Sequence, residues 1–420
     1  RSGTMWSSFA HIITGVIGSG VLTLAWSMAQ LGWIAGPLTM LAFALVTIVS
    51  AFLLSNCYRS FDAENRLCRN ASYREAVQRI LGKSSGLVCG VITQLGFFKV
   101  GVVYTIASSV SMGAIQRSNC FRNQGREAIC GNDNTTYYTL IFGIVQVAVS
   151  QIPDFSKTKW LSVFAAAMSF SYSAIGSGLG LAKVIEDREV KGSIWGVPAS
   201  TAVDKLWGVA QALGNIGFSF PFTVIFLEIM DTLKSDPAEK VTMKKASILS
   251  VSVTCLFYFL CGGLGYAAFG NSTPGNILTA FGDSSSETLW VVGFANACVV
   301  LHLVGAYQMF SQALYANIEK SLKRSFPNNR LFQNEVNPIA RLCLRSAYVS
   351  LTTGVALIFP YFNQAIAVSG AVSFWPTVVY FPAEMYLKQK SVPPCSWKSI
   401  ALRAYCLVGL VVMSFALVGS

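Results

Sequence analysis

Long apolar stretches recur along the chain, separated by short polar segments. A helix needs about 20 apolar residues to cross a hydrocarbon core about 30 Å thick. By that measure the pattern predicts eleven membrane spans, near residues 4–26, 33–57, 85–116, 136–152, 158–182, 206–230, 246–269, 289–317, 340–359, 361–386 and 399–419. The fourth is the shortest. We count it as a span because the distribution of Lys and Arg between inner and outer loops then fits best. The pattern therefore predicts an all-α integral membrane protein.

The composition agrees with a membrane protein. Of the 420 residues, 53% are hydrophobic and 12% are charged, whereas soluble domains carry about 25% charged residues. The first apolar stretch lacks a small-residue cleavage site, so we expect a span there rather than a cleavable signal peptide. Because the sequence opens at Arg1 rather than Met, we expect a cytosolic leader before it.

Lys and Arg are distributed unevenly between the loops. With the N-terminus inside, 23 of the 31 lie in inner segments, seven lie in outer loops, and Lys99 lies within the third span. Cytosolic loops of membrane proteins carry such an excess. We therefore predict a cytosolic N-terminus and, after eleven spans, an extracellular C-terminus. Contact with membrane lipid accounts for the net charge of +12, and no nucleic-acid partner is needed.

Most of the 11 cysteines lie in spans or inner loops, where thiols stay reduced. Cys120 and Cys130 instead share the outer loop after the third span, ten residues apart, so they are either a disulfide or two free thiols. We expect the disulfide. Glycosylation sequons on the outer side begin at Asn134 and Asn271, whereas the sequon at Asn70 is expected inside and unmodified.

The spans divide into two halves of equal length. Spans one to five and spans six to ten each occupy close to 180 residues. Because five is odd, the second half must cross the membrane in the opposite direction. We therefore predict a first inverted repeat at 1–183, a second at 206–386, and an additional span at 399–419.

The first span of each half contains helix-weakening residues. These are the stretches "TGVIGSG" at 14–20 and "GNIGFSFPF" at 214–222. Paired interruptions in inverted halves are typical of transporter binding sites, since unwound backbone survives in a membrane only where it lines a cavity or is buried in protein. Freed N–H groups would donate to a carboxylate and freed carbonyls would accept from an ammonium, so an amino acid suits both. The alternative is that the glycines only allow close helix packing.

These considerations define the candidate substrate-binding residues. Backbone candidates from the two interruptions are Gly15, Ile17, Gly18, Ser19, Gly20, Gly214, Asn215 and Gly217. Aromatic candidates for covering the substrate are Tyr104, Phe218 and Phe220, although such side chains often serve only in a core.

Several motifs carry a family resemblance. They include "AHIITGVIGSGVLTLAW", "LGWIAGP", "QALGNIGFSFPF", "GYAAFGNSTPGN", "FANACVVLHLVGAYQ" and "YFPAEM". Together they resemble the plant amino acid permeases of the amino acid/auxin permease group, in the APC superfamily. The resemblance implies eleven spans, a leucine-transporter-like 5+5 inverted repeat, and proton-coupled amino acid uptake at the plasma membrane. Some relatives carry Asp where this chain has Asn215, and most have a small or apolar residue at Lys99.

Few residues could carry a coupled proton. His11 and His302 are the only histidines and both lie within spans, where ionisable groups are functional candidates. Glu228, at the inner end of the sixth span, is a third candidate. For each, the alternative is structural: an interhelical hydrogen bond for the histidines, or pairing with inner-loop cations for the acid.

Lys99 lies near the middle of the third span, about 18 Å from its start at Leu87. A lysine at that depth should face protein or the transport pathway rather than lipid. It is either a structural cation or a selectivity residue that disfavours cationic amino acids.

The sequence therefore favours a proton-coupled amino acid symporter whose partners are an amino acid, protons and membrane lipid. An auxin or other organic-acid symporter, and a sensor that binds without transporting, remain alternatives. We expect no enzyme, cofactor or metal, because the spans lack a convergent set of catalytic groups.

Overall fold

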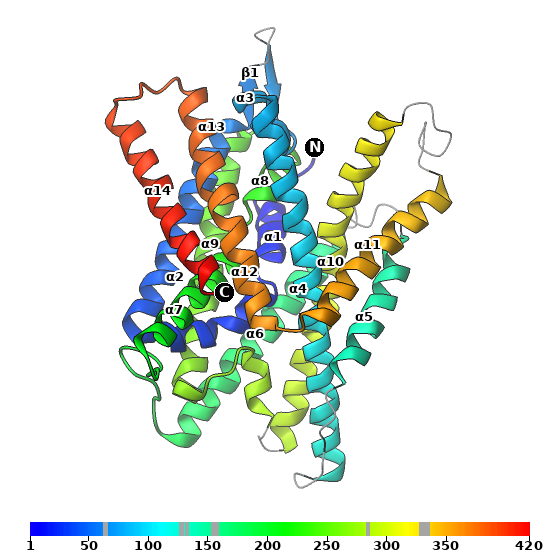
Figure 1. The fold of residues 1–420 in the computed structure, drawn as a ribbon, viewed down its shortest axis with the longest axis vertical. Coiled ribbons are helices and arrows are strands. Elements are labelled where there is room, and N and C mark those ends of the chain that lie inside the picture. Colours follow the sequence, from blue (N-terminus) through cyan, green and yellow to red (C-terminus); the bar gives the residue numbers. More distant parts are fainter. Residues whose placement is uncertain (62–65, 126–129, 131–133, 153–158, 283–285, 327–336) are drawn as a thin grey trace. The chain divides into compact units, whose positions relative to one another are not determined.

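The computed structural model describes residues 1–61, 66–125, 130, 134–152, 159–282, 286–326 and 337–420, and these are mostly helical (Figure 1). Helix is present in each of the eleven predicted stretches. Within the described residues, seven helical segments are long and apolar enough to cross a membrane: Ser19–Cys57, Lys83–Gln124, Ala202–Asp231, Glu239–Ser272, Thr288–Lys323, Phe362–Gln389 and Trp397–Val418. The segment predicted at 136–152 is a shorter apolar helix, Thr135–Ser150. The all-α membrane class is confirmed.

The chain forms two compact units, each built from separate stretches. The first unit comprises 1–93, 176–280 and 366–420, and the second comprises 94–175 and 281–365. Neither unit coincides with the halves predicted at 1–183 and 206–386. Each instead takes spans from both halves. The first unit takes the first two spans of each half together with most of the tenth span and the eleventh, and the second unit takes the third and fourth spans of each half together with most of the fifth.

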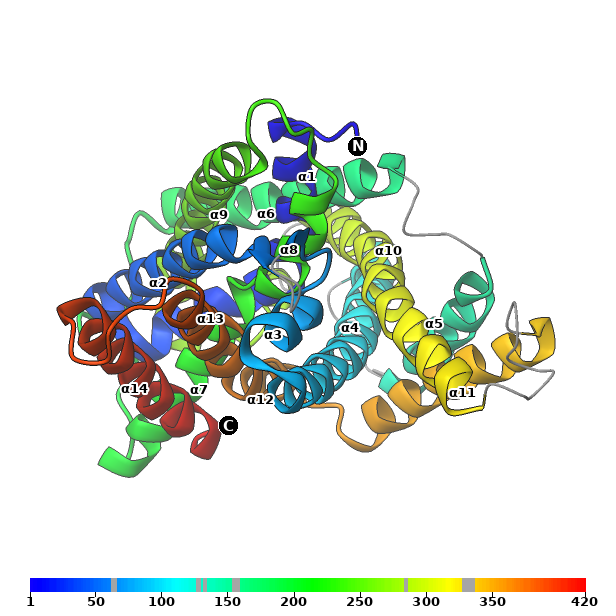
Figure 2. The ribbon, with the colours of Figure 1, turned by 90° about the horizontal axis from the view of Figure 1, so that it is seen from above.

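The first unit holds most of the helices and a small hairpin. Its elements are α1 (Met5–Val16), η1 (Ser19–Thr23), α2 (Leu24–Cys57), β1 (Arg59–Phe61), β2 (Leu67–Arg69), α3 (Tyr73–Leu81), α7 (Ala202–Ser219), α8 (Thr223–Asp231), α9 (Glu239–Phe269), η3 (Gly270–Ser272), η4 (Ile277–Phe281), α12 (Phe362–Phe374), the π-helical turn η5 (Trp375–Tyr380), α13 (Phe381–Gln389) and α14 (Trp397–Val418). Within this unit α2 is flanked by α9 and α13 (Figure 2).

The second unit is built from fewer, longer helices. Its elements are most of α4 (Lys83–Gln124), α5 (Thr135–Ser150), most of α6 (Lys159–Asp187), α10 (Ser286–Ser325) and α11 (Pro338–Ile358). Buried polar side chains hold α5 to its neighbours: Gln308 of α10 donates to Gln146 at 2.6 Å, and Arg345 of α11 donates to the Ser150 carbonyl at 2.5 Å.

Gly32 separates the first and second predicted spans within α2. Its φ is +84°, in the left-handed region that favours glycine. A Cβ at this position would lie 2.2 Å from the Ile194 carbonyl oxygen. The chain therefore turns at Gly32 against the loop that precedes α7.

The predicted inner end of the first unit is fastened by ion pairs and a backbone bridge. The Gly3 N–H donates to the Thr232 carbonyl at 3.0 Å, and Arg1 pairs with Asp231 at 2.8 Å. These contacts join the start of α1 to the end of α8. Glu239, at the start of α9, is 2% exposed and pairs with Arg59 and Arg69 of the β-hairpin.

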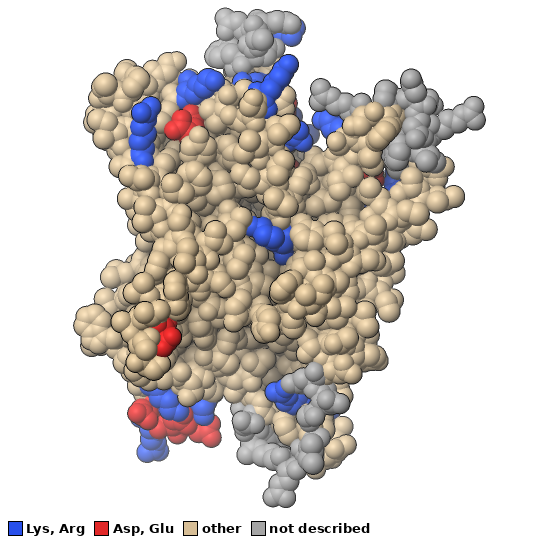
Figure 3. Space-filling model, viewed as in Figure 1, with Lys and Arg blue, Asp and Glu red and all other residues tan. Residues whose placement is uncertain are grey.

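On the face drawn in Figure 3, charged side chains are few, and most of the surface belongs to residues other than Lys, Arg, Asp and Glu. On α14, Leu407, Val408 and Val411 are each about 60% exposed. An apolar helix with so many exposed aliphatic side chains is typical of a lipid-facing position.

Candidate functional site

The first span is interrupted where the sequence predicted. Helix α1 ends at Val16, and η1 begins at Ser19. The N–H groups in between are already used: Ile17 donates to the Ile13 carbonyl at 2.8 Å, and Gly18 donates to the Val16 carbonyl at 2.9 Å. The first N–H groups of η1, beginning with Ser19 and Gly20, have no acceptor within that helix. They are therefore the best placed to bind an anion.

The second interruption begins later than the sequence predicted. Helix α7 continues through Ser219, and α8 starts at Thr223. Gly214 and Gly217 therefore lie inside a helix rather than in unwound backbone. Pro221 lies within the gap, where its missing N–H ends the helical hydrogen-bond ladder.

Gly214 serves helix packing. A Cβ on Gly214 would lie 2.5 Å from the Ala367 carbonyl oxygen of α12. At this residue the alternative interpretation, that glycine allows close contact between helices, is the better one. Asn215 is also buried in α7, and its Nδ2 donates to the Ser27 hydroxyl of α2 at 3.3 Å.

The two interruptions lie against each other within the first unit. A Cβ on Gly20 would lie 2.5 Å from the Ser219 Oγ and 3.1 Å from the Ser219 Cα. Gly15 likewise approaches α8, since a Cβ there would lie 2.8 Å from Ile225. Residues separated by about 200 positions in the sequence are thus brought together by the fold, with glycine on one side of each contact.

Tyr258 of α9 contacts both interruptions, and the sequence analysis missed it. Its hydroxyl lies 2.8 Å from the Val16 carbonyl oxygen and 2.7 Å from that of Ser219. The side chain is fully buried. The only sequence signal is a polar aromatic inside an apolar span, where a buried hydroxyl needs a partner.

The remaining candidates in the first unit lie around these breaks. His11 is half-buried in α1, one turn before Gly15. Phe218 is half-buried and close to Gly20, whereas Phe220 is fully buried with its ring 5.0 Å from that of Tyr258. Glu228 is exposed on α8.

His302 lies in the second unit, buried between α10 and α6. Its Nδ1 is 3.0 Å from the Ala165 carbonyl oxygen and 3.0 Å from the Ser169 hydroxyl. Because a carbonyl only accepts, the bond to Ala165 requires a proton on Nδ1. Nε2 has no hydrogen-bond partner within the described residues, so it is the nitrogen that a further proton would occupy.

Tyr104 and Lys99 both belong to α4 in the second unit. Tyr104 is 3% exposed, and its ring packs edge-on against Phe310 at 6.1 Å. Lys99 is half-buried. Its neighbours in sequence are core residues, since Phe97 packs against Phe310 and Phe98 against Tyr348.

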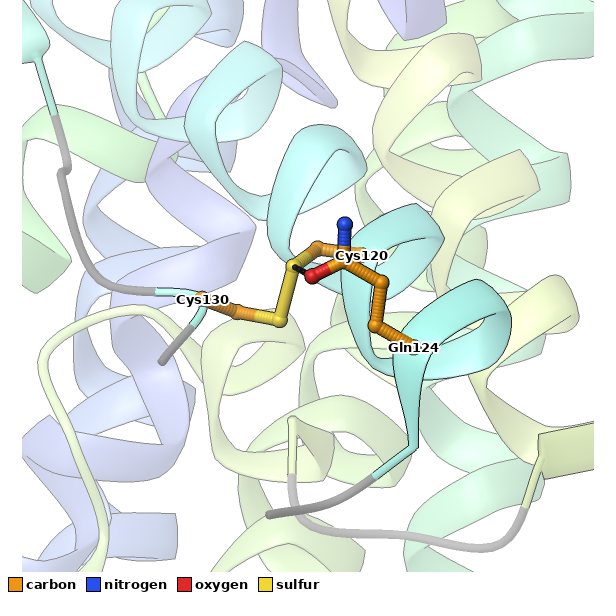
Figure 4. The surroundings of a disulfide bond; sticks show 3 residues. All are labelled: Cys120, Gln124 and Cys130. Atoms are coloured by element: carbon orange, nitrogen blue, oxygen red, sulfur yellow. Dashed lines mark hydrogen bonds between the residues drawn. A yellow bond between two sulfur atoms is a disulfide. The ribbon is translucent and has the colours of Figure 1, made fainter. Parts of the chain in front are cut away.

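Cys120 and Cys130 are joined by a disulfide at the end of α4 (Figure 4). The Cys120 Sγ also lies 3.7 Å from the Gln124 Oε1. The predicted glycosylation residues Asn134 and Asn271 are both exposed. Asn134 caps α5, where its side chain accepts from the Tyr137 N–H at 3.3 Å.

The chain has the leucine-transporter fold. The chain resembles the structure of MhsT in complex with L-phenylalanine, with a TM-score of 0.62 and 10% identity, covering 100% of this chain and 99% of that one. It also resembles Mhp1, a nucleobase-cation-symport-1 family transporter with bromovinylhydantoin bound, with a TM-score of 0.58 and 14% identity over 100% and 90% of the two chains.

The chain belongs to the family described as transmembrane amino acid transporter protein, which matches residues 1–420. Probable amino acid permease 7 of Arabidopsis thaliana is 51% identical over 100% of this chain and 92% of its own length. Amino acid permease 2 of the same plant is 46% identical over 100% and 87%. The predicted resemblance to plant amino acid permeases is confirmed. The relatives are named permeases, so the chain is a multi-pass membrane transporter-family protein rather than an enzyme.

We predict that Gly20→Ala destabilises the protein, because the new Cβ would lie 2.5 Å from the Ser219 Oγ and 3.1 Å from the Ser219 Cα across the two interruptions. Overpacking of this kind costs about 1 to 3 kcal/mol. Thermal unfolding of the detergent-solubilised protein should show a clearly lowered midpoint. Gly178→Ala is the matched control, because no atom lies within 4 Å of its new Cβ. Equal midpoints for the two variants would contradict the close approach of the interruptions.

Proposed function

We propose that the protein is a proton-coupled amino acid symporter that works by alternating access at the plasma membrane. The observation that carries the proposal is the contact between two helix interruptions inside the first unit. Membership of the transmembrane amino acid transporter family supports amino acids as the substrate class. The names of the plant relatives, and L-phenylalanine in the MhsT complex, support the same class.

The substrate binds with its charged groups at the interruptions. Its α-carboxylate accepts from the first N–H groups of η1, at Ser19 and Gly20, where the helix end carries partial positive charge. Its α-ammonium donates to carbonyl groups at the ends of α1 and α7. The side chain extends beyond Phe218, which is half-buried beside Gly20. A zwitterion satisfies both helix ends, whereas an organic acid satisfies only one.

The topology that we propose places the N-terminus in the cytosol and the C-terminus outside, with two inverted repeats. The division into compact units is compatible with the repeat for the first four spans of each half, whereas the fifth span of each half lies mostly in a different unit. The exposed sequons at Asn134 and Asn271 and the disulfide at Cys120 are compatible with an extracellular position.

Uptake of radiolabelled amino acids at two external pH values tests the function. We expect accumulation against a gradient that is faster at the lower pH. Competition separates the alternatives: unlabelled amino acids should reduce uptake, whereas an auxin or simple organic acid should not. Binding of amino acid without accumulation would instead identify a sensor.

We propose that His302 carries the coupled proton, with His11 and Glu228 as the other candidates. The arrangement that supports His302 is its buried ring, held at Nδ1 by Ala165, with Nε2 as the position for a second proton. A proton there creates a buried charge, so its binding should depend on the conformation of the helices around it.

We predict that His302→Gln weakens the dependence of uptake rate on external pH more than it weakens substrate affinity. Glutamine keeps a donor toward Ala165 but does not titrate in this range. Initial rates measured between pH 5 and pH 8 give the profile. His11→Gln serves as the comparison within the first unit. If both variants keep the wild-type profile, histidine coupling is wrong and Glu228 becomes the candidate.

We predict that Lys99→Gly raises uptake of arginine relative to glutamate. The variant removes a cation from the middle of α4, and like charges repel strongly where solvent is scarce. Competition by arginine, alanine and glutamate should therefore change in rank. Lys398→Gly removes an exposed cation at the start of α14 and should leave the ranking unchanged. An identical ranking in wild type and Lys99→Gly would assign Lys99 a structural role only.

A further inference from the structure

The hydroxyl of Tyr258 lies within hydrogen-bond distance of both interrupted helices. Its hydroxyl oxygen is 2.8 Å from the carbonyl oxygen of Val16, the last residue of α1. It is 2.7 Å from the carbonyl oxygen of Ser219, the last residue of α7. Both carbonyls belong to helix ends, where intrahelical donors are missing. Tyr258 therefore lies within hydrogen-bond distance of the last carbonyl before each interruption.

The two carbonyls compete for a single proton. A phenol carries one O–H, so at any moment it donates to one carbonyl only. The Val16 carbonyl also accepts from the Gly18 N–H at 2.9 Å. The hydroxyl can therefore donate to either carbonyl, and the Val16 carbonyl has the Gly18 N–H as a further donor.

The ring of Tyr258 engages the second break as well. Its centroid lies 5.0 Å from that of Phe220, in an edge-on arrangement, and both side chains are fully buried. A displacement of either helix end would break a hydrogen bond or this ring contact in a buried environment. Such losses are costly because no water replaces the missing partner.

We propose that Tyr258 is a positioning residue that sets the spacing of the two helix interruptions and so holds the substrate-binding backbone groups in register. The inference rests on the proposed function, because it concerns the same site. Tyr258 acts through the carbonyls of Val16 and Ser219 and need not touch the substrate. Loss of its hydroxyl should therefore lower affinity for the amino acid rather than the amount of folded protein.

Tyr258→Phe tests the proposal with Tyr266→Phe as its matched control. Tyr266 is also fully buried in α9, two turns further along, and its hydroxyl also contacts two backbone groups, the N–H of Ser193 at 2.8 Å and the carbonyl of Ser193 at 3.1 Å. Those groups belong to a loop rather than to an interruption. The two variants remove the same atom from the same helix.

We expect Tyr258→Phe to raise the apparent KM for amino acid uptake about tenfold, which corresponds to roughly 1.4 kcal/mol. Vmax per molecule at the cell surface should stay within about twofold of wild type. Tyr266→Phe should leave KM unchanged, even if it lowers the amount of surface protein. An unchanged KM in Tyr258→Phe, or an equal rise in Tyr266→Phe, would overturn the proposal.

If Tyr258→Phe does not reach the surface, 3-fluorotyrosine at position 258 keeps the shape of the side chain and makes its hydroxyl a stronger donor. KM should then fall below the wild-type value, and an unaltered KM would also overturn the proposal. The wild-type protein reports separately on the proposed function. If it shows neither uptake nor thermal stabilisation by amino acids, the proposed function is wrong, whatever the variants do.

Discussion

Backbone groups in a membrane must find hydrogen-bond partners inside the protein, and this requirement governs the structure. A continuous helix meets it within its own segment. The first and sixth predicted spans do not, because α1 ends at Val16 and α7 ends at Ser219. Partners for their terminal carbonyls come from the neighbouring turn, through Gly18, and from Tyr258 of α9. Helix α9 therefore contributes a hydrogen-bond donor at both breaks.

Close approach of the broken helices requires small residues at the contacts. Gly20 faces Ser219, Gly15 faces Ile225, and Gly214 faces Ala367, each at a distance that leaves no room for a Cβ. Glycine therefore has two uses in the same motifs. Gly18 lies in the unwound backbone at residues 17 and 18. In α7, Gly214 allows that intact helix to lie against α12. The motifs therefore contain both unwound backbone and glycine that allows close packing, at different residues.

An ion pair and a backbone bridge join the two interrupted spans at their other ends, the start of α1 and the end of α8. The start of α1 and the end of α8 are joined by the bridge from Gly3 to Thr232 and by the pair of Arg1 with Asp231. Helix α1 is thus held at its start by these contacts and at its end by Tyr258, and the end of α8 is held by the same contacts at the predicted inner surface. A change in one half-helix should be felt by the other, which is what alternating access needs.

The sequence by itself determined the class, the positions of the helices and the existence of two interruptions. Those features depend on local quantities: the length of an apolar stretch against the bilayer thickness, and the cost of glycine or proline in a helix. The motifs around the interruptions were also sufficient to place the chain in its family.

The tertiary structure alone decided where the second break begins, which glycines serve packing, and which side chains complete the hydrogen bonds. Gly214 carries the same local signal as Gly18, yet it lies in an intact helix because α12 packs against it. The hydrogen-bond partners of Tyr258 and His302 are the carbonyl groups of Val16, Ser219 and Ala165, which are all distant in sequence. A hydrophobic pattern indicates that a residue is buried. The hydrogen-bond partners of that residue depend on which helices the fold places beside it.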